Sequence, residues 1–153
     1  MSDFHQNGVI STLHNLSNRP LSEIEQELRE YGKDAPIELI LPSLYSELEG
    51  AALKNIVSCL SNVKYLNHIT IGLDKANKSE FIKAKKFFLN LNQPHSVIWN
   101  DSPKMKKLDS DFKKLGIAPN QAGKGKNVWY CMGYTYSRNE AGSVALHDCD
   151  ITT

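Results

Sequence analysis

The sequence has little of the features that would place a protein in a class at once. Its 3 cysteines, Cys59, Cys131 and Cys149, are odd in number and widely spaced, so they do not form the disulfide framework of a small secreted domain. No apolar run is long enough to cross a bilayer, and residues 1–5 lack the basic and apolar stretches of a secretory signal. Neither sign of charge prevails, because the net charge is +1. We therefore expect a cytoplasmic protein without a membrane span and without a nucleic-acid partner.

Strand and helix patterns alternate along a chain whose 153 residues suit one domain. Short apolar strands are expected at 37–41 (closed by Pro42), 68–73, 96–99 and 144–146. Helical spacing is found over 22–31, 48–60, from 79, over 103–115 and over 127–137, with 116–126 as a loop. Ser22 with Glu25 fits a capping box, Gly32 a helix end and Ser79 a further N-cap. Strands that are apolar on both faces and alternate with helices predict an α/β fold with a mostly parallel sheet.

Polar residues follow each expected strand: Glu47, Asp74, Asn100 with Asp101, and the run from His147 to Asp150. In open parallel sheets, ligands bind outside the carboxyl ends of the strands. The order of these residues therefore predicts one binding site at that edge of the sheet.

The triplet Asp148-Cys149-Asp150 is the strongest candidate for chemistry. If the strand continues through it, both carboxylates point the same way, as Mg²⁺ or Mn²⁺ bound to a diphosphate requires. Taken alone, such a triplet is more often simply the polar end of a strand than a metal site. A zinc site on His147 and Cys149 is disfavoured, because no second Cys/His pair has zinc-site spacing.

The segment Gly123-Lys124-Gly125-Lys126 precedes a helix and could hold a phosphate, since glycine lets the backbone approach and lysine adds charge. Its spacing is not that of a Walker A loop, and taken alone a solvated glycine turn is slightly favoured. The other lysine clusters are at 83–86 and 104–114. They are expected on solvated helix faces.

Taken together, these motifs resemble the GT-A glycosyltransferases, most of all the branch of bacterial glucosyl-3-phosphoglycerate synthases and related family-2-type enzymes. The matching segments, in chain order, are residues 4–14, 41–44 with Glu47, 99–101, 123–129 and 145–151. The resemblance implies a Rossmann-like sheet flanked by helices that stops after the Asp-x-Asp strand.

The resemblance also implies roles for individual residues. The segment Pro42-Ser43-Leu44 would line the base and ribose, with Glu47 and Asp74 near the nucleoside. The other donor-site residues would be Asn100, Asp101, Gly123, Lys124 and Asp148. Lys124 would contact the diphosphate or the base, Asp148 would bind ribose or metal, and Asp150 would bind the metal directly. Lys124 and Asp150 would form the catalytic pair. The chain departs from the family at Tyr45-Ser46-Glu47 and at Leu73–Ala76, so the choice between UDP and GDP stays open.

By resemblance, residues 1–153 form the donor-binding half of a hexosyltransferase, with 1–35 as its lead segment and first helix. It would bind UDP- or GDP-hexose with Mg²⁺ or Mn²⁺ and serve transfer to an acceptor such as 3-phosphoglycerate with retention of configuration. The acceptor site would lie beyond Thr153, so the isolated chain is expected to be inactive. The strand at 144–146 would stay partly uncovered, and a homodimer is also implied.

Two alternatives remain. A sugar-phosphate nucleotidyltransferase would carry a glycine-rich loop directly after the first strand, where this chain has Pro42-Ser43-Leu44-Tyr45. A non-catalytic nucleotide-binding module is the other.

Overall fold

The computed structural model describes residues 19–151. The segment at 4–14 that carries part of the family resemblance lies outside these residues.

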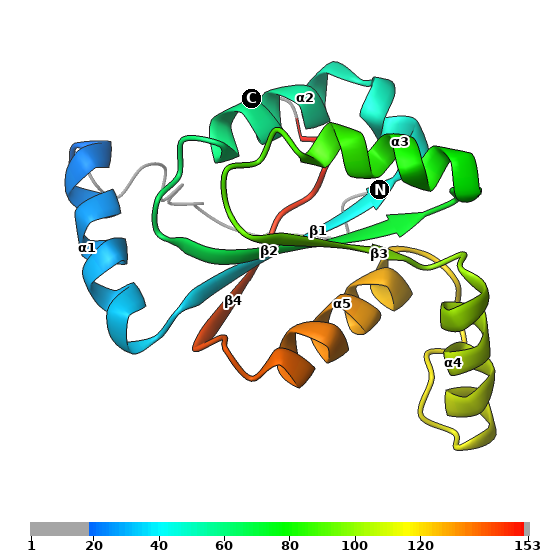
Figure 1. The fold of residues 1–153 in the computed structure, drawn as a ribbon. Helices are drawn as coiled ribbons and strands as arrows, with labels where there is room; N and C mark the ends of the chain where they lie inside the picture. Colours follow the sequence, from blue (N-terminus) through cyan, green and yellow to red (C-terminus); the bar gives the residue numbers. More distant parts are fainter. Residues whose placement is uncertain (1–18, 152–153) are drawn as a thin grey trace, which may run out of the picture.

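The described chain forms an α/β fold around a four-stranded parallel sheet (Figure 1). The strands are β1 (Ile37–Leu44), β2 (Leu66–Asp74), β3 (His95–Trp99) and β4 (Ser143–Leu146), and their order is β3-β2-β1-β4. Each neighbouring pair is parallel. The predicted fold class is therefore confirmed.

Strand β1 runs further than predicted, through Pro42 to Leu44. β4 pairs with β1 only from Ile37 to Ile40, and the carbonyl of Ile40 accepts the N–H of His147 at 3.1 Å. Pro42 lies two residues further along, so its nitrogen faces the same side, where β1 no longer has a strand partner. The missing N–H therefore costs no ladder hydrogen bond, and Pro42 does not close the strand.

Helices cover both faces of the sheet (Figure 1). The first face carries α2 (Ala51–Leu60) and α3 (Lys78–Phe88), and the second carries α5 (Lys124–Arg138). A 3₁₀ turn, η1 (Tyr45–Glu49), follows β1, while α1 (Leu21–Asp34) and α4 (Pro103–Lys114) lie at opposite sides of the molecule.

Two predicted helix caps are wrong. The N-cap of α3 is Asn77, whose Oδ1 accepts the N–H of Ser79 at 2.9 Å and of Glu80 at 3.0 Å. Glu80 completes the capping box, so Ser79 lies inside the first turn rather than at the cap. Helix α1 begins after Pro20 without a side-chain cap, so the box of Ser22 does not form.

The predicted end of α1 is also wrong, because the helix passes Gly32 and continues to Asp34. A glycine ends a helix by adopting a left-handed conformation, and among the described glycines only Gly116 and Gly123 have positive φ. In this surface helix, which buries no residue, Gly32 only weakens the helix interior.

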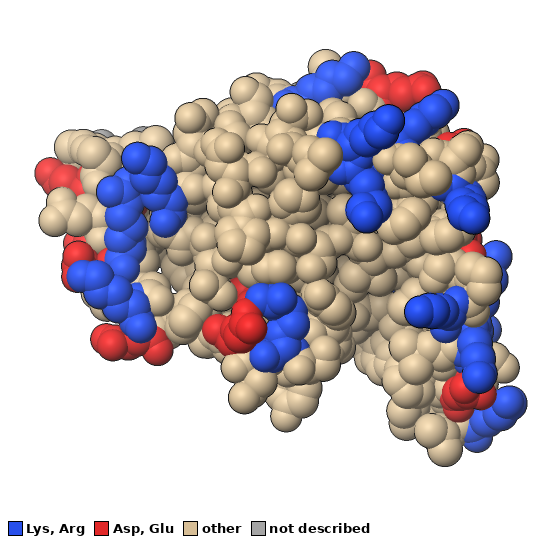
Figure 2. Space-filling view, viewed as in Figure 1, with Lys and Arg blue, Asp and Glu red and all other residues tan. Residues whose placement is uncertain are grey.

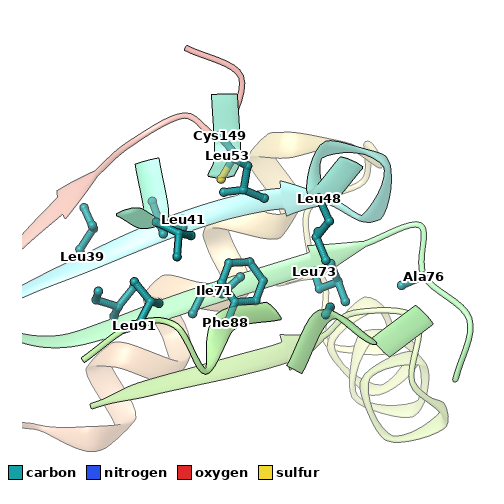
Figure 3. Packing of buried hydrophobic residues seen from close by; sticks show 13 residues of the cluster. Leu39, Leu41, Leu48, Leu53, Ile71, Leu73, Ala76, Phe88, Leu91 and Cys149 are labelled. Atoms are coloured by element: carbon teal, nitrogen blue, oxygen red, sulfur yellow. The ribbon is translucent and has the colours of Figure 1, made fainter. Parts of the chain in front are cut away.

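The main core lies between the sheet and the helices α2 and α3 (Figure 3). Inward side chains of β1 and β2 meet Leu53 of α2 and Phe88 of α3 there. Burial of such side chains is the main stabilising term, at about 1.5–3 kcal/mol for each. Cys149, which follows β4, belongs to the same cluster and lies close to Leu53 in Figure 3.

The face beneath α5 is more polar than predicted. Glu38, His68 and Thr70 are buried on it, so β1 and β2 are not apolar on both faces. His68 Nε2 contacts Ser96 Oγ at 3.1 Å, and Arg138 Nε lies 3.6 Å from Glu38 Oε1. Burial, with Arg138 nearby, lowers the pKa of His68. Periodicity could not detect this layer, because buried polar residues break an apolar pattern without ending a strand.

The remaining surface agrees with two expectations. Strand β4 is exposed along its whole length, as predicted for the strand at 144–146. The lysines of α3 and α4 are exposed, and Figure 2 shows basic side chains in separate groups with acidic ones among them. Within residues 19–151, no helix is long and apolar enough to cross a membrane.

Candidate functional site

A pocket of about 540 Å³ opens at the carboxyl edge of the sheet. Strand β1 has β2 on one side and β4 on the other, so the edge contains the topological switch point at which open α/β sheets bind ligands. The pocket is lined by the ends of β1, β2 and β3, by α4, by the first turn of α5 and by the segment after β4.

All of the predicted site residues line this one pocket. They are Pro42, Ser43, Leu44, Glu47, Asp74, Asn100, Asp101, Gly123, Lys124, Asp148 and Asp150. The structure thus brings together side chains from five separate segments, as the order of polar strand ends predicts.

Glu47 has a partner within its own turn. Its Oε2 accepts the backbone N–H of Leu44 at 2.8 Å, which fixes the path of the chain where β1 turns into η1. A charged acceptor makes this a strong hydrogen bond. Glu47 therefore shapes the pocket wall at Pro42–Leu44.

The ends of β2 and β3 are joined by two side-chain hydrogen bonds. Asn100 Nδ2 donates to Asp74 Oδ1 at 2.8 Å, and the N–H of Ala76 donates to Asp101 Oδ2 at 3.0 Å. Lys75, between Asp74 and Ala76 in the chain, has a φ of 53°. The bond from Ala76 to Asp101 helps to hold this left-handed conformation. Burial raises the pKa of Asp74, and the bond from Asn100 opposes that shift.

Helix α5 begins at Lys124, earlier than predicted. Gly123 is its N-cap, with φ 127°, a backbone conformation that glycine adopts without strain. The expected loop at 123–126 is therefore largely the first helical turn, whose N–H groups have no intrahelical partners. Such a turn favours anions, so the correction strengthens the phosphate interpretation of the motif.

The segment Asp148-Cys149-Asp150 is not a strand, because β4 ends at Leu146 and a turn follows. The expected strand alternation of the two carboxylates is therefore wrong. Instead, Cys149 is 2% exposed in the core, and both aspartates that flank it line the pocket. Burial raises the pKa of the Cys149 thiol to about 12, so it is a packing residue and a poor zinc ligand.

Lys124 forms an ion pair with Asp148 across the pocket. Within residues 19–151, no group of three His, Cys, Asp or Glu side chains is placed to hold a metal ion. Two pocket carboxylates nonetheless suit Mg²⁺, which commonly binds one or two carboxylates and completes its shell with waters and substrate phosphates.

Sequence reasoning missed a second charged cluster in the pocket, centred on Asp109 of α4. Its Oδ1 accepts from Tyr130 Oη at 2.6 Å and lies 2.5 Å from Lys126 Nζ, while its Oδ2 lies 2.9 Å from Lys113 Nζ. The hydrogen bonds from Lys126 and Tyr130 hold the pKa of Asp109 well below its usual range. The pKa of Tyr130 is raised, by burial first and by Asp109 second. The spacing of Asp109 and Lys113 is a detectable signal, but the contact with α5 is tertiary.

The fold and the pocket define the class of protein. A parallel sheet flanked by helices, with its pocket at the switch point, is a Rossmann-like α/β arrangement, and it matches part of a GT-A fold.

In comparisons with known proteins, the chain is similar to two glucosyl-3-phosphoglycerate synthases. The chain is 44% identical over 151 residues to the glucosyl-3-phosphoglycerate synthase of Persephonella marina (strain DSM 14350 / EX-H1), covering 99% of the chain and 38% of that protein. It is 33% identical over 152 residues to the enzyme of the same name from Methanococcoides burtonii (strain DSM 6242 / NBRC 107633 / OCM 468 / ACE-M), covering 99% of the chain and 37% of that protein. No family model matches the chain, and no solved structure gives a significant match. The predicted relationship to these glycosyltransferases is confirmed, and the chain spans about 38% of the length of the curated relatives it matches.

Proposed function

We propose that residues 1–153 form the donor-binding part of a hexosyltransferase of the glucosyl-3-phosphoglycerate synthase type. The observation that carries the proposal is the convergence of every predicted donor-site residue on one pocket. Similarity along 99% of the chain to two proteins of that name supports it. The donor would be a UDP- or GDP-hexose, and the acceptor 3-phosphoglycerate, bound with residues outside this chain.

The nucleoside would occupy the side of the pocket formed by β1 and β2. Pro42 and Leu44 offer apolar surface to a base, and Asp74 offers a half-buried carboxylate to its polar groups. The hydrogen bond from Asn100 orients that carboxylate. In this arrangement Glu47 supports the wall rather than contacting the base, because its carboxylate already caps Leu44.

The diphosphate would lie against the first turn of α5. The N–H groups of that turn and the ammonium of Lys124 supply positive charge where a departing nucleoside diphosphate becomes more negative. Groups held in place before the reaction stabilise that charge without reorganisation of solvent. No protein nucleophile is required for this contribution.

Asp148 and Asp150 would hold Mg²⁺ or Mn²⁺ beside the diphosphate. When bound, the ion supplies further stabilisation of the leaving group. The buried side chain of Cys149 anchors the turn that presents both carboxylates. Within this proposal the protein acts in the cytoplasm, and the exposed β4 edge is where a homodimer would form.

The competing enzyme class, a sugar-phosphate nucleotidyltransferase, fits the chain after β1 less well. The 3₁₀ turn Tyr45–Glu49 follows that strand, and it contains no glycine. Nucleotidyltransferases bind nucleoside triphosphates through a glycine-rich loop at that place.

Calorimetric titration tests the proposal. The chain should bind UDP-glucose or GDP-glucose in the presence of Mg²⁺, and the matching nucleoside diphosphate should compete better than the triphosphate. Preference for the triphosphate would favour the nucleotidyltransferase. Binding of neither donor would contradict the proposal, and nucleotide binding that UDP-glucose and GDP-glucose cannot displace would favour a non-catalytic module.

A further inference from the structure

Two lysines in the first turn of α5 each contact an aspartate of the pocket, but the two ion pairs differ in exposure. The side chains of Lys124 and Asp148 are 54% and 37% exposed. Those of Lys126 and Asp109 are 19% exposed each, with the charged atoms 2.5 Å apart. Asp109 also contacts Tyr130 and Lys113. Among residues 19–151, the second pair therefore belongs to a network of charged and polar groups, and the first pair does not.

The difference in exposure decides which pair can open. An ion pair in water is weak, because both partners are rehydrated when they separate. Opening the pair of Lys126 would leave a half-buried Asp109 without its strongest partner and would loosen α4, a helix that buries no residue of its own. Lys126 is therefore a structural residue that ties α4 to α5, and Lys124 is free to change partner.

The members of the exposed pair are suited to two ligands of opposite charge. The ammonium of Lys124 suits a phosphate, and the carboxylate of Asp148 suits a divalent cation. In the ligand-free chain, the ammonium of Lys124 and the carboxylate of Asp148 neutralise each other's charge. Asp150, the neighbouring pocket carboxylate, makes no ion pair within the described residues, so it stays open to a cation.

We propose that the Lys124–Asp148 pair is a closed contact that nucleoside diphosphate and divalent cation open together. The diphosphate binds Lys124, which releases Asp148 for the cation. The cation binds Asp148, which releases Lys124 for the diphosphate. By linkage, each ligand then raises the affinity for the other by the same factor. This inference rests on the proposed function and adds to it how the site couples its two ligands.

The test measures binding of UDP and GDP to the chain by calorimetry, in excess chelator and again in excess Mg²⁺. Asp148→Asn keeps the shape of the side chain but releases Lys124. It should tighten metal-free binding about twofold to fivefold, the range set by the strength of an exposed ion pair, and should reduce the gain from Mg²⁺. Lys124→Gln should weaken binding under both conditions.

The double variant Lys124→Gln/Asp148→Asn separates the ion pair from a general charge effect. If Asp148 acts by occupying Lys124, the metal-free gain from Asp148→Asn disappears when Lys124 is absent. Asp111→Asn is the matched control, because it makes the same change in an exposed pair with Lys114 that lies outside the pocket; it should change neither titration.

Three results would overturn the inference: no gain in metal-free affinity for Asp148→Asn, a gain that persists without Lys124, or an equal gain for Asp111→Asn. With Mg²⁺-dependent binding intact in the unaltered chain, such a result leaves the proposed function standing. Absence of nucleotide binding in the unaltered chain would instead contradict the proposed function.

Discussion

The side-chain amide of Asn127 donates to the carbonyl of Gly72 at 2.8 Å, and this bond joins α5 to β2 near the carboxyl end of the strand. A side chain at position 72 would have no space, since its Cβ would lie 2.5 Å from Cys131 Sγ and still closer to Asn127 Oδ1. Gly72 therefore allows α5 to lie close to the sheet. The bond also sets where the first turn of α5 lies relative to the pocket.

Gly72→Ala should destabilise the fold by roughly 2–4 kcal/mol, because the added methyl overfills the contact and displaces the buried amide of Asn127. We expect a fall in Tm on the order of 10 °C. Gly133 is the matched control: it lies in α5, and a Cβ there meets open space. Gly133→Ala should raise stability by about 0.5–1 kcal/mol, as alanine favours a helix interior. If Gly72→Ala left the free energy of unfolding unchanged or raised it, as expected for Gly133→Ala, the close approach of α5 to β2 would be contradicted.

The three cysteines should differ in their reaction with a thiol reagent at pH 8. Cys59 is exposed, whereas Cys131 and Cys149 are buried, and burial raises the pKa of each buried thiol to about 12. One thiol should therefore react rapidly, and two only after denaturant is added. Cys59→Ser should remove the rapid phase. A rapid reaction of Cys149 would show that the turn at 148–150 is not anchored in the core.

The contribution of Asp109 to stability should depend on pH. Since its folded-state pKa lies below the usual value of 3.8, its stabilising effect is complete above that value and is lost as the pH falls below it. The difference in unfolding free energy between the unaltered chain and Asp109→Asn should therefore shrink from pH 6 to pH 2–3 (roughly the range over which carboxylates titrate). Urea unfolding at several pH values measures it.

Asp111→Asn is the control for that series, because the ion pair of Asp111 among the described residues is with the exposed Lys114, and such pairs contribute little. Its pH dependence should follow that of the unaltered chain. Parallel curves for all three proteins would contradict the network around Asp109.

Much of the fold and of the site could be predicted from local pattern. Asp74 and Asn100 follow apolar strands, and parallel strands end at one edge of a sheet, so their meeting follows from strand order alone. Lys124 begins the helix that precedes β4. A helix that leads into a parallel strand begins at the carboxyl edge of the sheet, so the position of Lys124 at the pocket also follows from element order.

Features set by tertiary contacts could not be predicted. The start of α5 depends on Gly123 at φ 127°, which no periodicity reveals. The turn at 148–150 replaces a strand because Cys149 enters the core beside α2. Asp109 and Lys126 lie on different helices, and only the folded chain brings them within 2.5 Å. The similarity to glucosyl-3-phosphoglycerate synthases was recognisable from motifs, because the motifs are local.

Above all, we propose that the pocket binds a nucleotide-diphosphate sugar together with a divalent cation held by the aspartates after β4. Asp150→Ala is the most direct test of this proposal, since Asp150 lines the pocket but makes no ion pair within the described residues and lies on the exposed side of the turn. Titration of UDP-glucose and GDP-glucose by calorimetry should show Mg²⁺-dependent binding to the unaltered chain. The gain from Mg²⁺ should be lost in Asp150→Ala, at an unchanged Tm. An equal gain from Mg²⁺ in both proteins would contradict the account.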